Sequence, residues 1–383
     1  MVDTAWLNEV SDAEEAAALT VRLVNQRSYP GEEAGAQAEV AAWFRENGIE
    51  PELQDLHDGR QNVIVTIENG NGPVVLLNGH VDTVLAAEGW KQDPWKTWRE
   101  GDTLYGLGAC DMKSGVAAAM LATRALARRT DLWNGTLIFT SVVDEEAYSV
   151  GARGLVERGI QADACIVTEA NWHRPNIGGV GKVLVRADIT GKASHGSWPQ
   201  DGINAAVEGA KLVARLDDME LGLHPKMTPT QAVLAFHSGS AQYVITVPEK
   251  ARFTINRHIV PGETGETVLA EMRKLADSLD SPATFEFAID PPYYPAWETD
   301  LSEPLIARFS RAYAAEAGVE PEFQYNDGVA DTNYFSTDLG IPSVQFGPRG
   351  GAYHQANEWV DIPSIGAAVR VVLRTALATF AGE

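Results

Sequence analysis

Short apolar runs recur along this chain, and polar or glycine-rich residues follow each of them. The runs are Val74–Leu77, Leu137–Phe139, Cys165–Val167 and Ser343–Phe346. Continuous apolar runs of this length are typical of strands buried on both faces of a parallel sheet. Helical spacing of apolar residues predicts helices in other segments, at Ala34–Asn47, Gly115–Arg128 and Pro304–Ala317. We therefore expect an α/β domain in which helices flank a sheet.

From about Ile177 the pattern changes, because apolar and polar residues now alternate. Val183, Val185, Ala187 and Ile189 share one face of an expected strand. A helix, two strands, a helix and a strand are expected after it, at Ile203–Leu216, Thr230–His237, Ala251–Ile259, Gly265–Leu279 and Thr284–Ile289. The order β-α-β-β-α-β is the ferredoxin-like arrangement. We expect this α+β domain, residues 177–290, to be inserted into a first domain formed by residues 1–176 and 291–383.

The length and charge of the chain narrow the classes of function. Its 383 residues, 45% of them hydrophobic, suit two domains better than one. A formal net charge of -23 argues against binding to nucleic acid or to an anionic membrane surface. The start has no basic, apolar leader pattern and no run reaches about 18 apolar residues, so we expect a cytoplasmic protein without a membrane span. Cys110 and Cys165 are too few for a disulfide framework, which suits a reducing compartment.

Five residues of metal-ligand type occur in the order His, Asp, Glu, Glu, His, and at least four of them follow the strand-like runs. They are His80, Asp111, Glu146, Glu169 and His354. Because the carboxyl ends of parallel strands meet at one edge of a sheet, we expect these side chains to meet there. Imidazole and carboxylate ligands suit zinc, cobalt or manganese in a catalytic site, whereas structural zinc sites are usually rich in thiolates.

Two divalent ions are compatible with this set of ligands. If Asp111 bridges them, each ion receives three protein ligands and keeps a position for water. The three carboxylates and a bridging hydroxide would bring the charge of the cluster close to neutral. Cys110, beside Asp111, is expected to be a buried, inert thiol.

Common nucleotide-binding and serine-hydrolase motifs are absent from this sequence. Gly106 and Gly108 could open a GxGxxG motif, but its third glycine position is Asp111. There is also no GxxxxGK[ST] loop and no GxSxG elbow.

The segments around the expected ligands resemble the signature segments of the M20 family of metallopeptidases and amidohydrolases. These segments are Gly79–Val84, Tyr105–Gly115 and Asp144–Glu146, and the resemblance continues through Thr168–Glu169, Gly191–Gly196, Asp331–Asn333 and Gly347–His354. The family includes acetylornithine deacetylase, succinyl-diaminopimelate desuccinylase and the glutamate carboxypeptidases. The resemblance implies a zinc-exopeptidase-like catalytic domain with a mixed sheet flanked by helices. It also implies that the ferredoxin-like insert is a dimerisation and lid domain.

The resemblance further implies how the metal ligands are divided. His80, Asp111 and Glu169 would hold one zinc ion, and Asp111, Glu146 and His354 would hold the other. Cobalt or manganese would fit the same ligands.

Three catalytic roles follow from the resemblance. Asp82 would orient the imidazole of His80 through its second ring nitrogen. Glu145 would take a proton from water and deliver it to the departing amine. His195, in the insert, would reach the active site of a partner subunit and stabilise the oxyanion, which would make a homodimer necessary for catalysis.

Two sites are candidates for binding the carboxylate of the substrate. Arg257 matches an arginine of the insert that grips a substrate carboxylate, and a guanidinium can do so bidentately. Arg349 and the adjacent Gly350, in the loop before His354, are a second candidate site. The family often carries an Asn where this chain has Ile245, so the specificity stays open.

We therefore expect a homodimeric di-zinc amidohydrolase. The first hypothesis is removal of the acyl group from a small N-acyl amino acid. The second is carboxypeptidase or dipeptidase action on a short peptide, which uses the same machinery. A third, a metal- or ligand-binding protein without turnover, is disfavoured because a pure binder needs neither Glu145 nor His195. The acyl group and the amino-acid side chain stay open.

Overall fold

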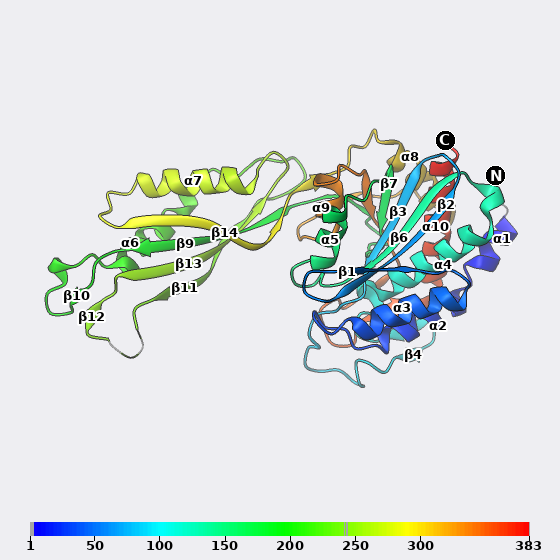
Figure 1. Ribbon diagram of the computed structural model, residues 1–383, viewed down its shortest axis with the longest axis horizontal. Helices are drawn as coiled ribbons and strands as arrows, with labels where there is room; N and C mark the ends of the chain where they lie inside the picture. The colour runs from blue at the N-terminus through cyan, green and yellow to red at the C-terminus, as the bar shows by residue number, and fades with distance from the viewer. Residues whose placement is uncertain (1–3, 241, 243, 383) are drawn as a thin grey trace. The chain divides into compact units, whose positions relative to one another are not determined.

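The computed structural model describes residues 4–240, 242 and 244–382, and it divides into two compact units (Figure 1). Unit 1 comprises Met1–Gly178, Glu298–Gln324 and Ala330–Glu383, and unit 2 comprises Gly179–Trp297 and Tyr325–Val329. The expected ranges end close to these boundaries, although the short segment 325–329 was not expected to join unit 2. Two compact units do not by themselves show that each range folds independently. The division into two domains therefore stays a prediction.

The main sheet of unit 1 is mixed, as expected. Its strands run in the order β1-β2-β6-β3-β7-β17-β8-β15, and β16 pairs with β8. In chain order they are β1 Glu52–Asp55, β2 Gln61–Asn69, β3 Val74–His80, β6 Gly135–Val142, β7 Ala164–Val167, β8 Asn176–Gly179, β15 Trp297–Glu298, β16 Gln324–Asn326 and β17 Ser343–Gln345. The neighbours β6, β3, β7 and β17 are mutually parallel, whereas β1, β2 and β8 pair antiparallel. The four parallel strands are those predicted from the apolar runs, and their carboxyl ends share one edge.

Helices flank this sheet. They are α1 Thr4–Val10, α2 Ala13–Val24, α3 Ala34–Glu46, α4 Ser114–Arg128, α5 Val150–Arg158, α8 Pro304–Ala317, α9 Thr332–Thr337 and α10 Ile362–Phe380. The alanine-rich α4 is almost wholly buried and packs on β3 and β6, and α9 packs on β17. Shorter helical turns are η1 Ala109–Lys113 and η2 Thr130–Leu132 in unit 1, and η3 Pro199–Asp201 and η4 Leu216–Asp218 in unit 2.

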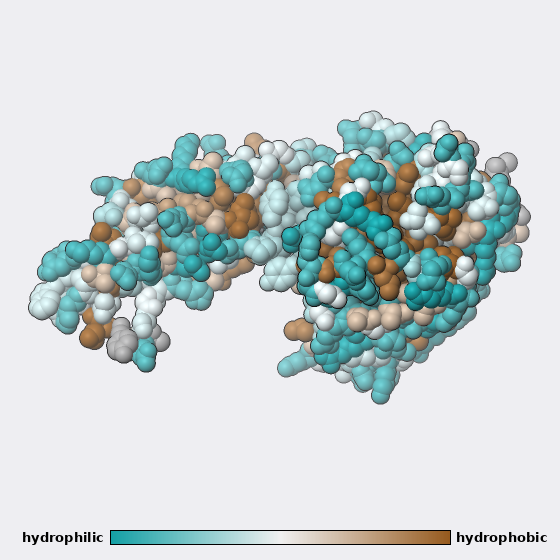
Figure 2. All heavy atoms as spheres, viewed as in Figure 1, coloured by the Kyte–Doolittle hydropathy of each residue, from teal (hydrophilic) through white to brown (hydrophobic). Residues whose placement is uncertain are grey.

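Among the described residues, α10 is the helix long and apolar enough to cross a membrane by length and composition. However, 72% of its apolar stretch is buried inside the structure, where it packs against α2, α4 and α8. This burial is typical of a core helix. Hydrophilic residues cover much of the visible face of each unit (Figure 2).

Each unit also contains one small sheet. One has the order β18-β19-β5-β4, with β4 Trp98–Glu100, β5 Thr103–Tyr105, β18 Gly350–Gly351 and β19 Trp359–Asp361. It brings the segment before Asp111 next to the segment around His354. The other pairs β10 Ser194–His195 with β12 Thr246–Val247.

Unit 2 has the ferredoxin-like topology that the sequence predicts. Its strands are β9 Gly181–Thr190, β11 Gln231–Ser238, β13 Lys250–Ile259 and β14 Thr284–Tyr294, in the antiparallel order β11-β13-β9-β14. The helices α6 Ala205–Ala214 and α7 Gly265–Asp277 cover one face. The four alternating residues of β9 that the sequence placed on one face are all fully buried in this core.

Candidate metal centre and catalytic site

The parallel strands bring the expected ligands of unit 1 to one edge of the sheet. His80 is the last residue of β3, Glu146 lies in the turn after β6, and Glu169 lies just after β7. Asp111 lies before α4. The start of α4 packs closely against the end of β7, and a Cβ on Gly115 would lie only 1.8 Å from the carbonyl oxygen of Thr168. A glycine is therefore required at that contact.

Asp111 lies between two imidazoles. Its Oδ1 is 3.4 Å from Nε2 of His80, and its Oδ2 is 3.3 Å from Nε2 of His354. On the His80 side, Glu169 Oε1 is 3.8 Å from the same Nε2, and on the other side Glu146 Oε1 is 3.2 Å from Nε2 of His354. Asp111 therefore contacts both imidazoles, with Glu169 on the His80 side and Glu146 on the His354 side. Glu145 Oε2 also lies 3.8 Å from Nε2 of His80, so the division of the ligands between two ions stays a prediction.

The donor atoms fit a divalent cation. Ligand atoms of His80, Asp111 and Glu146 all lie within 4.8 Å of one another. Nε2 of His80 is buried and has no hydrogen-bond partner among the described residues. Its Nδ1 lies 3.1 Å from the backbone oxygen of Asp82. A proton on Nδ1 would be donated to that oxygen and would leave the Nε2 lone pair free for a metal.

The electrostatics of the cluster also favour a cation. Burial, with the nearby Asp111 carboxylate, raises the pKa of Glu169 to about 8. Burial likewise raises the pKa of Glu145 well above its usual value. Contacts with Asp111 and Glu146 raise the pKa of His354 to about 10. Several carboxylates packed out of water disfavour their own charged forms unless positive charge joins them.

Asp82 makes contacts beyond the one with His80 that the resemblance implies, and its role in orienting His80 stays a prediction. Its carboxylate accepts the backbone N–H of Glu145 at 3.2 Å and that of Glu146 at 2.9 Å. It is fully buried, and its Oδ1 is 3.5 Å from Nδ1 of His80. Asp82 therefore connects the end of β3, which carries His80, to the turn that carries Glu145, the expected base. Contacts to backbone N–H groups leave no mark in the sequence.

Arg60 was missed by the sequence reasoning. Its Nη1 donates to Glu33 at 2.8 Å and to Asp144 at 2.7 Å, and both of these carboxylates are buried. Asp144 directly precedes Glu145 and has a left-handed φ of 70°. Its carboxylate also accepts the N–H of Tyr148 at 3.1 Å. This network fixes the turn between β6 and α5.

The remaining expected residues of unit 1 lie in the β18 region. Arg349 is 44% exposed in its side chain, and its Nη2 is 2.9 Å from Asp361. Gly350 lies in β18, where a Cβ would lie 2.3 Å from the Cys110 sulfur. Cys110 is buried, as expected, and burial raises the pKa of its thiol.

In unit 2, His195 is exposed and Arg257 is not. The backbone N–H of Ser197 donates to Nδ1 of His195 at 3.1 Å, which places the proton of the neutral ring on Nε2. Arg257 has 0% side-chain exposure and donates to Glu263 at 2.6 Å. Its position on β13 explains this burial, since alternate residues Phe253, Ile255 and Ile259 share its helix-covered face.

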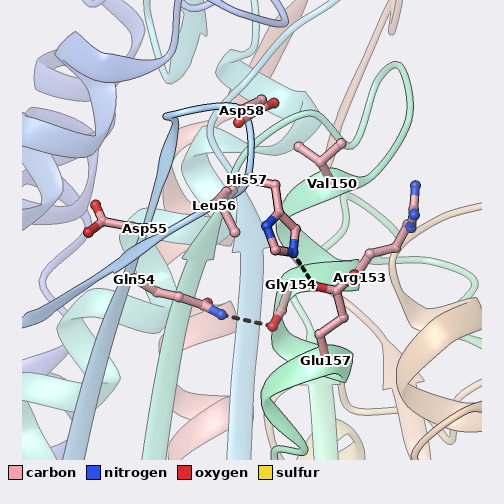
Figure 3. Close-up of a pocket in the computed structure, with 9 residues that line it drawn as sticks. All are labelled: Gln54, Asp55, Leu56, His57, Asp58, Val150, Arg153, Gly154 and Glu157. Carbon is pink, nitrogen blue, oxygen red and sulfur yellow. Dashed lines mark hydrogen bonds and ion pairs between the residues drawn. The ribbon is translucent and has the colours of Figure 1, made fainter.

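A separate surface pocket of about 180 Å³ lies in unit 1 between the end of β1 and α5 (Figure 3). His57 points toward Glu157 across it, with 3.2 Å between Nε2 and Oε2. Gln54 donates to the backbone oxygen of Gly154 at 2.8 Å. None of the expected metal ligands lines this pocket, so its His and Glu offer controls for substitutions at the centre.

Comparisons with known proteins agree with this geometry. The model of the peptidase family M20/M25/M40 matches residues 76–378. The chain is 25% identical over 376 residues to an N-formyl-4-amino-5-aminomethyl-2-methylpyrimidine deformylase of Bacillus subtilis, covering 88% of each chain. It is 28% identical over 367 residues to a succinyl-diaminopimelate desuccinylase of Xanthomonas euvesicatoria, covering 91% of this chain and 94% of the relative.

Solved structures share the fold. The aminopeptidase PepT of Bacillus cereus superposes with a TM-score of 0.78 at 22% identity, covering 96% of this chain and 99% of that one. The YXEP protein of Bacillus subtilis, described as a dinuclear metal binding peptidase, gives a TM-score of 0.74 at 18% identity and covers 99% of each chain. The chain therefore belongs to the peptidase family M20/M25/M40 and is a metal-dependent hydrolase of amide C–N bonds.

Proposed function

We propose that this hydrolase holds two divalent metal ions and removes the acyl group from an N-acyl amino acid. The observation that carries the proposal is the position of Asp111, with one carboxylate oxygen toward each imidazole. His80, Asp111 and Glu169 would hold one ion, and Asp111, Glu146 and His354 the other. Zinc is the first choice, and cobalt or manganese would fit the same ligands. Bound ions would polarise the amide carbonyl and lower the pKa of a water molecule.

Glu145 is the proposed general base. Its Oε2 is 3.8 Å from Nε2 of His80, the same separation as that of Glu169 Oε1. Its role as a base and not a ligand therefore rests on the resemblance of Asp144–Glu146 to the family's signature segment. Glu145 takes a proton from the attacking water and donates it to the nitrogen of the leaving amine. The new C–O bond forms first and gives a tetrahedral oxyanion. Its collapse breaks the C–N bond, and the products are a carboxylic acid and a free amine. The carboxylate of Asp82 positions Glu145 by accepting the backbone N–H of Glu145.

His195 is proposed to donate from Nε2 to the oxyanion, in the active site of a partner subunit. The tautomer favours a donor at that atom. We propose that the homodimer forms through unit 2, where the edge strand β11 exposes Val233, Leu234 and Phe236. An exposed edge strand with apolar side chains can pair with a second copy of itself.

The nature of the relatives favours deacylation over peptide cleavage. The deformylase and the desuccinylase, at 25% and 28% identity, both remove a small acyl group from an amine. Carboxypeptidase or dipeptidase action is the second proposal, since solved structures named as a metallo-carboxypeptidase and a dipeptidase share the fold. For the substrate carboxylate, Arg349 is more accessible than Arg257, which has 0% side-chain exposure.

Amine release from a panel of substrates would test this function. The panel contains N-formyl, N-acetyl and N-succinyl amino acids and dipeptides, with zinc- or cobalt-loaded protein. Glu145→Gln should abolish release, whereas Glu157→Gln, in the separate surface pocket, should leave it unchanged. Release that persists in Glu145→Gln would contradict the assigned base. Faster cleavage of dipeptides than of acylated amino acids would favour the second proposal.

A further inference from the structure

Glu358 joins two loops that carry metal ligands. It lies four residues after His354 and is 1% exposed. Its Oε1 accepts the backbone N–H groups of Cys110 at 2.8 Å and Asp111 at 2.9 Å, and its Oε2 accepts that of Gly108 at 2.8 Å. Its own backbone oxygen accepts the N–H of Gly106 at 3.1 Å.

The helical turn η1, which Glu358 contacts, is irregular at Asp111. Asp111 has φ -109° and ψ 96°, which lie outside the helical range. The carboxylate of Glu358 is therefore a main fixed contact of the Asp111 backbone N–H. Both oxygens of Asp111 lie within 3.4 Å of an imidazole nitrogen, so a small rotation of this backbone would disturb both sides of the centre.

We propose that Glu358 is a positioning residue that sets the metal affinity of the centre by fixing the backbone of Asp111 against the loop of His354. This inference rests on the proposed function, because it takes Asp111 and His354 to be ligands. It assigns a role in metal binding to a carboxylate that does not itself face the ligand atoms. Removal of residues that hold metal ligands in place typically weakens binding by about 10- to 100-fold.

Two variants separate position from charge. Glu358→Gln removes the charge and turns an NH₂ group toward backbone N–H donors. Glu358→Asp keeps the charge, but its side chain is one methylene shorter and cannot hold all three N–H groups. The control is Glu316→Gln, since Glu316 is a carboxylate of low exposure that pairs with Arg370 and Arg374 away from the centre.

The test is the affinity for Zn²⁺, measured by competition with a chromophoric chelator, together with the absorption spectrum of the Co²⁺-loaded proteins. Both Glu358 variants should bind Zn²⁺ about 10- to 100-fold more weakly than the wild type and show altered Co²⁺ bands. Glu316→Gln should match the wild type in both. Far-UV circular dichroism of the metal-free proteins establishes that they are folded, and Glu358→Asp decides the matter if Glu358→Gln does not fold.

Wild-type affinity in both Glu358 variants would overturn the inference. Wild-type affinity in Glu358→Asp alone would also overturn it, because charge rather than position would then set the affinity. Failure of the wild type itself to bind Zn²⁺ would instead contradict the proposed function, so the two failures are distinguishable.

Discussion

Replacement of Arg60 tests whether buried charges hold the turn between β6 and α5. Arg60→Met removes the guanidinium that lies between Glu33 and Asp144, whose side chains are 1% and 3% exposed. It leaves two carboxylates without their cationic partner. Removal of one partner from a buried ion pair costs about 3–5 kcal/mol. Because Arg60 is itself 20% exposed and water can reach part of the site, we expect the free energy of unfolding to fall by about 3 kcal/mol.

The assay is urea unfolding of the metal-free protein, followed by circular dichroism and tryptophan fluorescence. Arg45→Met is the control, since the Arg45–Glu50 pair is exposed and such pairs contribute less than about 1 kcal/mol. Adding Glu33→Gln to Arg60→Met should restore part of the stability, because it removes one unpaired buried charge. Equal unfolding free energies for Arg60→Met and Arg45→Met would refute the reasoning.

The pH dependence gives a second check on the same residue. Burial raises the pKa of Glu33 above its usual value even with Arg60 present. Loss of Arg60 raises the pKa of Glu33 in the folded state further. The buried ionised carboxylate therefore destabilises the fold as the pH rises above the pKa of Glu33 in the unfolded chain, about 4.3. Below about pH 4.3, where Glu33 is protonated in both the folded and unfolded states, this contribution disappears. The destabilisation by Arg60→Met should therefore shrink as the pH falls from 7 toward 4.

Three further predictions concern the site and the assembly. Asp82→Ala leaves two backbone N–H groups without an acceptor, and kcat should fall about 10- to 100-fold with a smaller change in KM. Arg349→Ala should raise KM for acylated amino acids with little change in kcat, and an unchanged KM would exclude it as the carboxylate contact. Leu234→Asp places a charge on the exposed edge of β11. Light scattering should then detect a monomer where the wild type is a dimer, and a wild-type monomer would contradict the dimer.

The parallel strands at the centre of unit 1 could be predicted because continuous apolar runs are a strong signal. The strands β18 and β19 could not, since they have two and three residues and no periodicity to detect. Arg257 shows a signal that was not used. Its alternation with Ile255 and Ile259 places it on the buried face of β13, away from an open surface.

The ligands and Asp82 could be proposed from the sequence, but Arg60, Glu358 and the backbone contacts of Asp82 could not. These contacts involve backbone N–H groups and carboxylates far away in the chain. Glu358 is separated from Asp111 by 247 residues. Only the fold brings such groups together, because backbone donors are the same at every residue except proline.

The number of metal ions bound per chain tests the central claim most directly. Isothermal titration of chelator-treated protein with Zn²⁺, checked by elemental analysis, would measure it. We expect two ions for the wild type, one tightly held ion for His354→Ala, and none for Asp111→Ala, because Asp111 serves both sides. His57→Ala, which alters an exposed histidine of the separate surface pocket, should still bind two. One ion per wild-type chain, or two ions in Asp111→Ala, would contradict the shared centre.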